Sequence, residues 1–247
     1  MFNPLEQFET IPLYPLRFVY LFDITITNYT LTLCIILGVL SFIFFNFIYS
    51  IKLVPSYSQA FAEILYIFVF NILNQQAGKK GESYFPIVFT LFFFILISNL
   101  VGLTPFGFTV TAQFILTISL AFSLNFGLII VGFLLHGIYF LKKFLPPDTP
   151  FWLLPFLCVI EVVSYLIRTL SLSVRLFANM LAEHALMHII SSAFVILIAK
   201  VGYLAPLLAI SVILAVMILE TGIAFLQAYV FVILFCIYLS ESLEISH

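Results

Sequence analysis

Uninterrupted apolar stretches, several of them long enough to cross a lipid bilayer, dominate this chain of 247 residues. Hydrophobic residues make up 64% of the sequence and charged residues only 8%, which is more apolar surface than a soluble core needs. A bilayer core about 30 Å thick is crossed by a helix of about 20 residues. The sequence therefore predicts an all-α membrane protein, folded as a single polytopic membrane domain over residues 1–247.

Charges and prolines divide the first part of the chain into segments. Residues 1–28 contain three prolines and are predicted to be an N-terminal surface segment of irregular structure. Residues 31–51 are uncharged and predict a transmembrane helix. Residues 56–76 place polar residues at helical spacing and predict an interfacial amphipathic helix. Residues 85–135 hold two apolar stretches joined by an uncharged linker, which predict a helical hairpin.

The last hundred residues have a different pattern. Residues 151–243 hold two nearly uninterrupted apolar stretches, each about 55–60 Å long if helical. That length is about twice the thickness of the hydrocarbon core. We therefore expect two long, steeply tilted helices that form a hairpin with its turn near residues 199–202.

The basic residues that flank the first three predicted spans indicate the orientation of the chain. All of them fall on one side of the membrane, which the positive-inside rule assigns as the inner side. They are Lys52, Lys79, Lys80, Lys142 and Lys143.

Several classes of function are excluded. A net charge of −2 gives no basic surface for nucleic acid. The three cysteines are far apart and have no metal-site or redox spacing, so they are interpreted as packing residues. No P-loop is present. We expect neither a cofactor nor a metal.

Arg175 lies inside the first long apolar stretch. A guanidinium stays protonated in a protein, and placing one in a membrane helix costs about 3 kcal/mol on insertion scales. A chain that keeps this charge is expected to use it. At 100° per residue, the opposite helix face carries His184 and His188. The face of Arg175 carries Glu161, Arg168, Asn179 and Glu183.

The titratable residues fall into two groups at different depths. Glu161 and Glu241 lie toward the inner ends of the two long helices, whereas His184, His188 and Glu220 lie toward the outer side. Gln227 and Tyr238 share one flank of the second helix with Glu220 and Glu241. Because Arg175 lies between the groups and cannot relay a proton, the pattern predicts two proton half-channels separated by a fixed cation.

Other interpretations stay open at this point. Arg168 is either a structural partner of Glu161 or a group that tunes the site, and His184 and His188 are either functional or structural. The chain as a whole could be a proton-coupled secondary transporter in which Arg175 binds an anion, although such proteins favour helices broken at the midplane. It could also be a purely structural assembly subunit.

Two motifs on the long helices carry a family resemblance. The run Ser171-Leu-Ser-Val-Arg-Leu-Phe-Ala-Asn-Met180, followed by Ala182 and His184, and the run Leu226-Gln-Ala-Tyr-Val-Phe231 resemble subunit a of the F-type ATP synthase. Three further segments resemble the mitochondrial members, and the resemblance covers nearly the whole chain. These segments are Pro4–Phe8 with Ile11–Leu13, Asn99–Pro105 and Lys142–Pro150.

The resemblance implies a proton-translocating stator subunit that drives rotation of a c-ring, binds no nucleotide and is no enzyme by itself. It implies that Arg175 faces the ring carboxylate and separates the half-channels. The outer half-channel would contain His184, Glu220 and His188, and the inner one Glu161 and Glu241. Asn179, Gln227, Arg168 and Glu183 would contact the ring or support those that do. The family often has glycine where this chain has Glu183.

The implied partners are the c-ring proteolipids, the peripheral-stalk subunit b, other membrane-sector subunits, membrane lipids and protons, with no nucleic acid. The implied location is the mitochondrial inner membrane.

Overall fold

The structure is a computed structural model that describes residues 9–18, 22–49, 55–104, 108–144, 152–201 and 205–243. Most of these residues are helical. Within the described ranges, five helical segments are long and apolar enough to cross a membrane. The predicted class, an all-α membrane protein, is confirmed. The chain forms two compact units, which are described separately.

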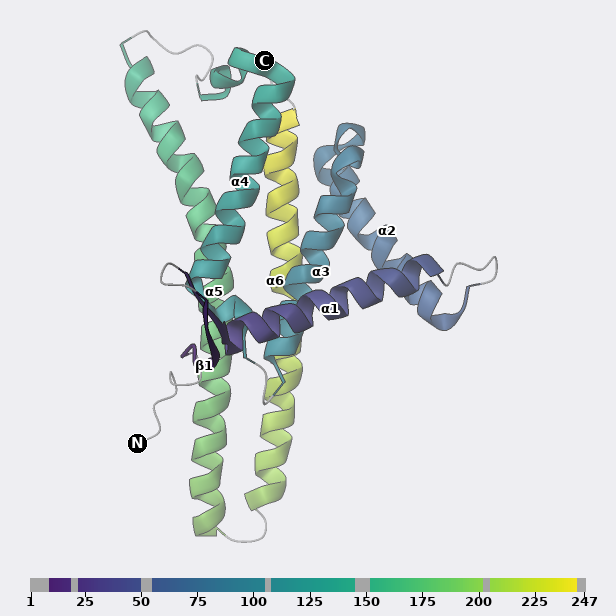
Figure 1. The fold of residues 1–247 in the computed structure, drawn as a ribbon, viewed down its shortest axis with the longest axis vertical. Helices are drawn as coiled ribbons and strands as arrows, with labels where there is room; N and C mark the ends of the chain where they lie inside the picture. The colour runs from purple at the N-terminus through teal and green to yellow at the C-terminus, as the bar shows by residue number, and fades with distance from the viewer. Residues whose placement is uncertain are drawn as a thin grey trace. The chain divides into compact units, whose positions relative to one another are not determined.

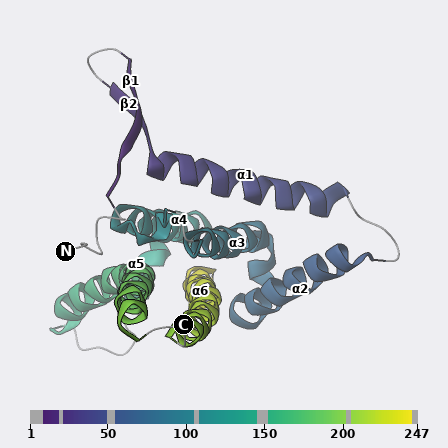
Figure 2. The same cartoon turned by 90° about the horizontal axis from the view of Figure 1, so that it is seen from below.

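The first unit comprises Met1–Tyr49, Phe93–Gln113 and Leu176–Ala228. Its N-terminal part contains strands β1 (Pro12–Phe18) and β2 (Phe22–Thr27), which pair antiparallel and lead into helix α1 (Asn28–Tyr49) (Figure 2). This hairpin differs from the predicted irregular segment. Each strand of a two-stranded sheet has a free edge that tolerates proline, and the ladder is irregular between Pro12 and Tyr14.

Threonine side chains fix the start of α1. Thr27 Oγ1 accepts a hydrogen bond from the Thr30 amide at 3.4 Å, and Thr30 Oγ1 accepts one from the Thr27 amide at 2.9 Å. This reciprocal arrangement satisfies two amide groups at a helix N-terminus. It explains why α1 begins at Asn28, ahead of the apolar stretch that starts at residue 31.

The second unit comprises Ser50–Phe92, Phe114–Arg175 and Tyr229–His247. It contains α2 (Tyr57–Ala77), the 3-10 helix η2 (Lys79–Tyr84), the first part of α3 (Phe85–Gly102), α4 (Phe114–His136) and the 3-10 helix η4 (Gly137–Phe144) (Figure 1). α2 covers the segment predicted to be interfacial and is not one of the five candidate spans. Gly78 ends α2 with a φ of 61°, a conformation that favours glycine.

Aromatic side chains hold α2 against its neighbours in the second unit. The ring centroids of Tyr66 and Phe85 are 4.6 Å apart, and those of Phe68 and Phe92 are 6.0 Å apart. Phe68 also contacts Tyr229 of α6, with centroids 5.8 Å apart. Part of the chain's large phenylalanine content thus serves helix packing, since such pairs add to the burial of their apolar area.

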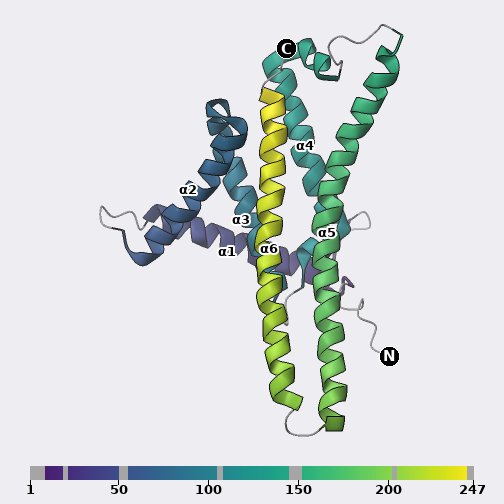
Figure 3. The same ribbon diagram turned by 180° about the vertical axis from the view of Figure 1, so that it is seen from behind.

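The two longest helices are α5 (Leu154–Val201, 48 residues) and α6 (Ala205–Leu243, 39 residues). Each contributes one segment to each compact unit. In the first unit the α5 and α6 segments lie side by side, whereas in the second unit α5 diverges from α6 toward its N-terminal end (Figure 3). Both helices exceed the roughly 20 residues that cross a bilayer. The steep tilt predicted from this excess stays a prediction. The turn was predicted near residues 199–202, but residues 199–201 still belong to α5, and residue 202 lies outside the described residues.

Candidate functional site

In the first unit, a pair of amide side chains joins α5 to α6. Asn179 Nδ2 donates a hydrogen bond to Gln227 Oε1 at 2.9 Å. One residue further along α5, Met180 is fully buried in a small core with Ala224 of α6 and Ala112 of the 3-10 helix η3 (Val110–Ala112). These contacts define an antiparallel register in which residue numbers on the two helices sum to about 405.

The end of α3 approaches the same part of α5 and α6. Asn99 Nδ2 donates a hydrogen bond to the carbonyl oxygen of Ala224 at 3.3 Å. A Cβ atom at Gly102 would overlap Thr109 Cγ2 and would lie 3.5 Å from His184 Nε2. Glycine at position 102 therefore lets the Thr109 side chain pack directly against the α3 backbone, with the imidazole of His184 at ordinary contact distance from the same point.

Two carboxyl groups are buried next to this contact region. Glu183 of α5 is 7% exposed and Glu220 of α6 is 2% exposed. The numbers 183 and 220 sum to 403, so the register places the two side chains opposite each other. The groups are close enough for a direct electrostatic interaction. The first unit thus brings Glu220, a predicted outer residue, together with Glu183, which was predicted to contact the ring or to support residues that do.

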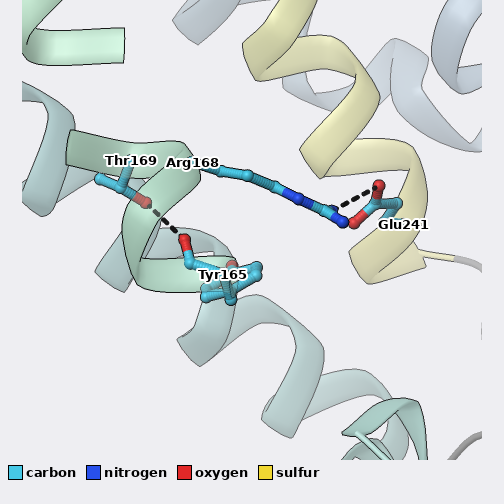
Figure 4. Close-up of polar contacts among 4 residues, drawn as sticks. All are labelled: Tyr165, Arg168, Thr169 and Glu241. Atoms are coloured by element: carbon cyan, nitrogen blue, oxygen red, sulfur yellow. Dashed lines mark hydrogen bonds and ion pairs between the residues drawn. The ribbon is translucent and has the colours of Figure 1, made fainter. Parts of the chain in front are cut away.

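In the second unit, an ion pair joins the two long helices near the predicted inner end. Arg168 Nη1 of α5 lies 3.6 Å from Glu241 Oε1 of α6, and both side chains are partly exposed (Figure 4). One interpretation of the sequence made Glu161 the structural partner of Arg168. Among the described residues no ion pair joins these two, because positions seven apart on a helix are separated by about two turns.

Residues that the sequence analysis did not single out as site residues surround this ion pair. Tyr165 and Tyr238 both interact electrostatically with Arg168 and Glu241. Thr169 Oγ1 donates to the Tyr165 carbonyl at 3.2 Å and accepts from Asn125 Nδ2 of α4 at 2.6 Å.

The Asn125 and Thr169 side chains line a small cavity together with Tyr238 and six apolar residues. The isolated amide of Asn125 in the apolar stretch 114–135 was a signal for this polar contact, because amides inside membrane helices are commonly satisfied across a helix interface.

Arg175 is exposed on α5, and no ion pair to it occurs among the described residues. Its charge acts on Tyr238 within the second unit. Arg175 is also the last α5 residue of the second unit, and Leu176 is the first of the other. Glu161 is partly exposed on the N-terminal part of α5. The side chain of His188 lies outside those that the structure describes.

No group of three or more His, Cys, Asp or Glu side chains that could hold a metal ion occurs in the described part of the chain. The free cysteines range from exposed Cys34 to buried Cys236. The chemistry available at both clusters is that of carboxyl, imidazole, phenol and guanidinium groups, which is suited to carrying and blocking protons.

Comparisons with known proteins cover almost the whole chain. The family model of the ATP synthase A chain matches residues 29–240. The ATP synthase subunit a of Acanthamoeba castellanii is 45% identical over 248 residues, which is 100% of both chains. The subunit a proteins of Marchantia polymorpha and Rhodospirillum rubrum are 41% and 39% identical, with 98% and 99% of both chains covered. The chain therefore belongs to the ATP synthase A chain family.

Proposed function

We propose that Arg175 separates an outer proton half-channel from an inner one, and that the c-ring turns past it. As a member of the subunit a family, the chain is a proton-translocating subunit in the membrane sector of the F-type ATP synthase. The supporting observation is the distribution of the predicted site residues. Glu183, His184 and Glu220 belong to one compact unit, and Glu161 and Glu241 to the other. The division of α5 falls between Arg175 and Leu176.

The outer half-channel delivers the proton to the ring. A proton enters from the outer side, passes His184 and Glu220, and neutralises a carboxylate of the ring. A neutral carboxylic acid can enter lipid at modest cost, whereas a carboxylate cannot. The burial of Glu220 supports this role, because a buried ionisable group inside a membrane helix is costly to keep without a use.

The inner half-channel takes the proton away. After a nearly full turn, the ring carboxylic acid meets the cluster that contains Glu161 and Glu241 and releases its proton to the inner side. The Arg168–Glu241 ion pair supports this assignment because its side chains are partly exposed. Glu241 can then exchange protons with water while Arg168 holds its position.

Arg175 has two tasks in this mechanism. Its permanent charge keeps the empty ring carboxylate ionised, and it blocks a direct leak because a guanidinium does not give up its proton. Its exposure, with no ion pair among the described residues, leaves it available to a partner carboxylate. Each proton is worth about 2.3 kcal/mol per 100 mV of membrane potential, which the ring converts to rotation.

The remaining proposals concern the setting of the subunit. The five candidate spans are those of a multi-pass membrane protein. We assign it to the mitochondrial inner membrane on the resemblance of its N-terminal and loop segments to the mitochondrial members. Its partners are the c-ring, subunit b and neighbouring membrane-sector subunits, and nucleotide chemistry belongs to other subunits.

A purification experiment tests the proposed function against the secondary-transporter alternative, which family membership disfavours. The chain is isolated from membranes under mild conditions and reconstituted in liposomes. Co-isolation with a proteolipid ring and ATP synthesis driven by an imposed proton gradient are expected. Saturable solute uptake by the isolated chain, without a ring, would overturn the proposal.

A further inference from the structure

Glu183 and Glu220 form a buried pair of acidic side chains that the proposed mechanism does not fully use. The helix register supports their juxtaposition independently of any electrostatic argument. The Asn179–Gln227 hydrogen bond and the Met180–Ala224 contact lie within one to two turns on the same two helices. Continuing that antiparallel register along α5 and α6 brings position 183 opposite position 220.

Among the described residues, no cation forms an ion pair with either carboxyl group. Both oxygens of Glu183 and Oε1 of Glu220 have no hydrogen-bond partner among the described residues, and no ion pair reaches either group there. Isolated carboxylates are expensive to bury, and two neighbouring ones cannot both be ionised cheaply. The favourable state of such a pair holds one proton that either group can carry.

The surroundings of Glu183 and Glu220 are consistent with a pair that holds one proton. On α5, the adjacent titratable residue is His184, whose imidazole lies against Gly102 and the Thr109 region. The parts of α3 and η3 in this unit, residues 93–113, contain no charged residue. On α6, Thr221 directly follows Glu220 and donates to the Met217 carbonyl at 2.8 Å, and Gln227 is bonded to Asn179. Among the described side chains of these elements, His184 is the one other group that can take up a proton, and the side chain of His188, one turn further along α5, lies outside those described.

We propose that Glu183 and Glu220 share one proton, and that Glu183 carries it from Glu220 toward the ring-facing part of α5. This inference rests on the proposed outer half-channel and adds a residue to it. The step is a proton transfer between two carboxyl oxygens, so the pair keeps one proton and one negative charge. Glu183 lies eight residues, about two helical turns, from Arg175 and is thus closer to it along α5 than His188.

The test uses the complete complex in liposomes, with ATP-driven proton pumping as the readout. Glu183→Gln keeps the size of the side chain but cannot accept a proton, and we expect pumping to fall at least about tenfold, the lower range for a lost proton-transfer group. Glu183→Asp should restore most of the rate. Glu63→Gln, at an exposed position of α2, is the matched control and should pump normally.

Two further measurements separate a shared proton from a structural role. The double variant Glu183→Gln, Glu220→Gln should be no slower than the slower single variant, because the two groups act as one unit. The infrared carbonyl band of a protonated carboxyl group in the unmodified complex should shift in Glu183→Asp. This band decides the matter even if Glu183→Gln does not assemble.

The outcomes also distinguish this inference from the proposed function. Normal pumping by Glu183→Gln together with a block in Glu220→Gln would overturn the shared pair and leave the outer half-channel intact. Normal pumping by Glu220→Gln would overturn the half-channel assignment itself. An infrared spectrum that is the same in Glu183→Asp and the unmodified complex would also reject the pair.

Discussion

Arg168 and Arg175 lie seven residues apart on α5, yet their surroundings differ. Arg168 forms an ion pair with Glu241 at 3.6 Å, whereas Arg175 has no ion pair among the described residues. A partly exposed ion pair contributes at most about 1 kcal/mol. Any residue with a positive charge at position 168 could therefore form a comparable pair with Glu241. A residue that faces a moving carboxylate needs a planar group with two parallel donors, which lysine lacks.

The first prediction compares the two arginines. We expect Arg175→Lys to abolish proton-driven ATP synthesis, because an ammonium can lose its proton and lacks the guanidinium fork. We expect Arg168→Lys to keep most of the activity, because the positive charge next to Glu241 is retained. Synthesis is measured in sealed membranes after native electrophoresis has shown equal assembly. Equal rates in the two variants would contradict the distinction.

The second prediction concerns the polar contact between α4 and α5. Thr169→Val keeps the shape of the side chain but removes the acceptor of the Asn125 amide, which is buried. Leaving a buried donor without a partner costs about 1–3 kcal/mol. We expect a lower midpoint of thermal unfolding for the purified complex. Thr169→Ser, which keeps the hydroxyl, should unfold near the unmodified midpoint; a Val variant that is just as stable would show that the bond contributes nothing.

The chemistry of the residues predicted part of the candidate site, but the side chains that contact the predicted residues could be identified only from the structure. Asn179 and Gln227 stood out as polar groups on apolar helices, and they share a hydrogen bond. The partner of Arg168 was not predictable, because the helical wheel describes one helix and Glu241 belongs to another. The electrostatic interaction between Glu183 and Glu220 likewise depends on how two helices pack, because the two residues are 37 positions apart in the sequence.

At the scale of elements, the close packing of Thr109, which precedes η3, against α3 depends on one glycine. We expect Gly102→Ala to reduce the stability of the complex by about 1–3 kcal/mol, because its Cβ would overlap Thr109 Cγ2. The double variant Gly102→Ala, Thr109→Ser removes the overlapping methyl group and should recover most of the loss. Thermal unfolding and proton pumping are measured together.

Gly38 of α1 supplies the control for this third prediction. An added Cβ there meets nothing within 4 Å, so Gly38→Ala should leave stability unchanged or slightly higher. If Gly102→Ala behaves like Gly38→Ala, the close packing of Thr109 against Gly102 of α3 is refuted.

The elements that the sequence predicted best are the long apolar helices. Their length and hydrophobicity follow from the thickness of a bilayer, which acts on every residue of a span. The β1–β2 hairpin was not predicted, because Pro12 and Pro15 are turn signals that a free strand edge overrides. Helix α1 begins three residues before the predicted start at residue 31. The reason is local, because Thr27 and Thr30 exchange hydrogen bonds at the helix N-terminus.

At the scale of the whole molecule, the mechanism requires that the two clusters reach water on opposite sides of the membrane. Glu161 and Glu241 belong to the second compact unit and His184 to the first. If the two clusters are parts of separate half-channels, a water-soluble reagent added on one side should reach one cluster and not the other. Cysteine labelling measures this directly, once Cys34, Cys158 and Cys236 have been replaced.

The fourth prediction is the labelling pattern in the sealed, assembled complex. Glu161→Cys and Glu241→Cys should react with an impermeant thiol reagent added from the inner side, whereas His184→Cys should react only from the outer side. Tyr57→Cys and Ile11→Cys, both at exposed positions, are the inner and outer controls that follow from the lysine pattern. The contrast is informative because the proposed mechanism puts the fixed charge of Arg175 between the two clusters and requires that no continuous water path joins them. Labelling of Glu161→Cys from the outer side would therefore contradict the orientation and the two-channel mechanism together, since one continuous aqueous path would let protons cross without turning the ring.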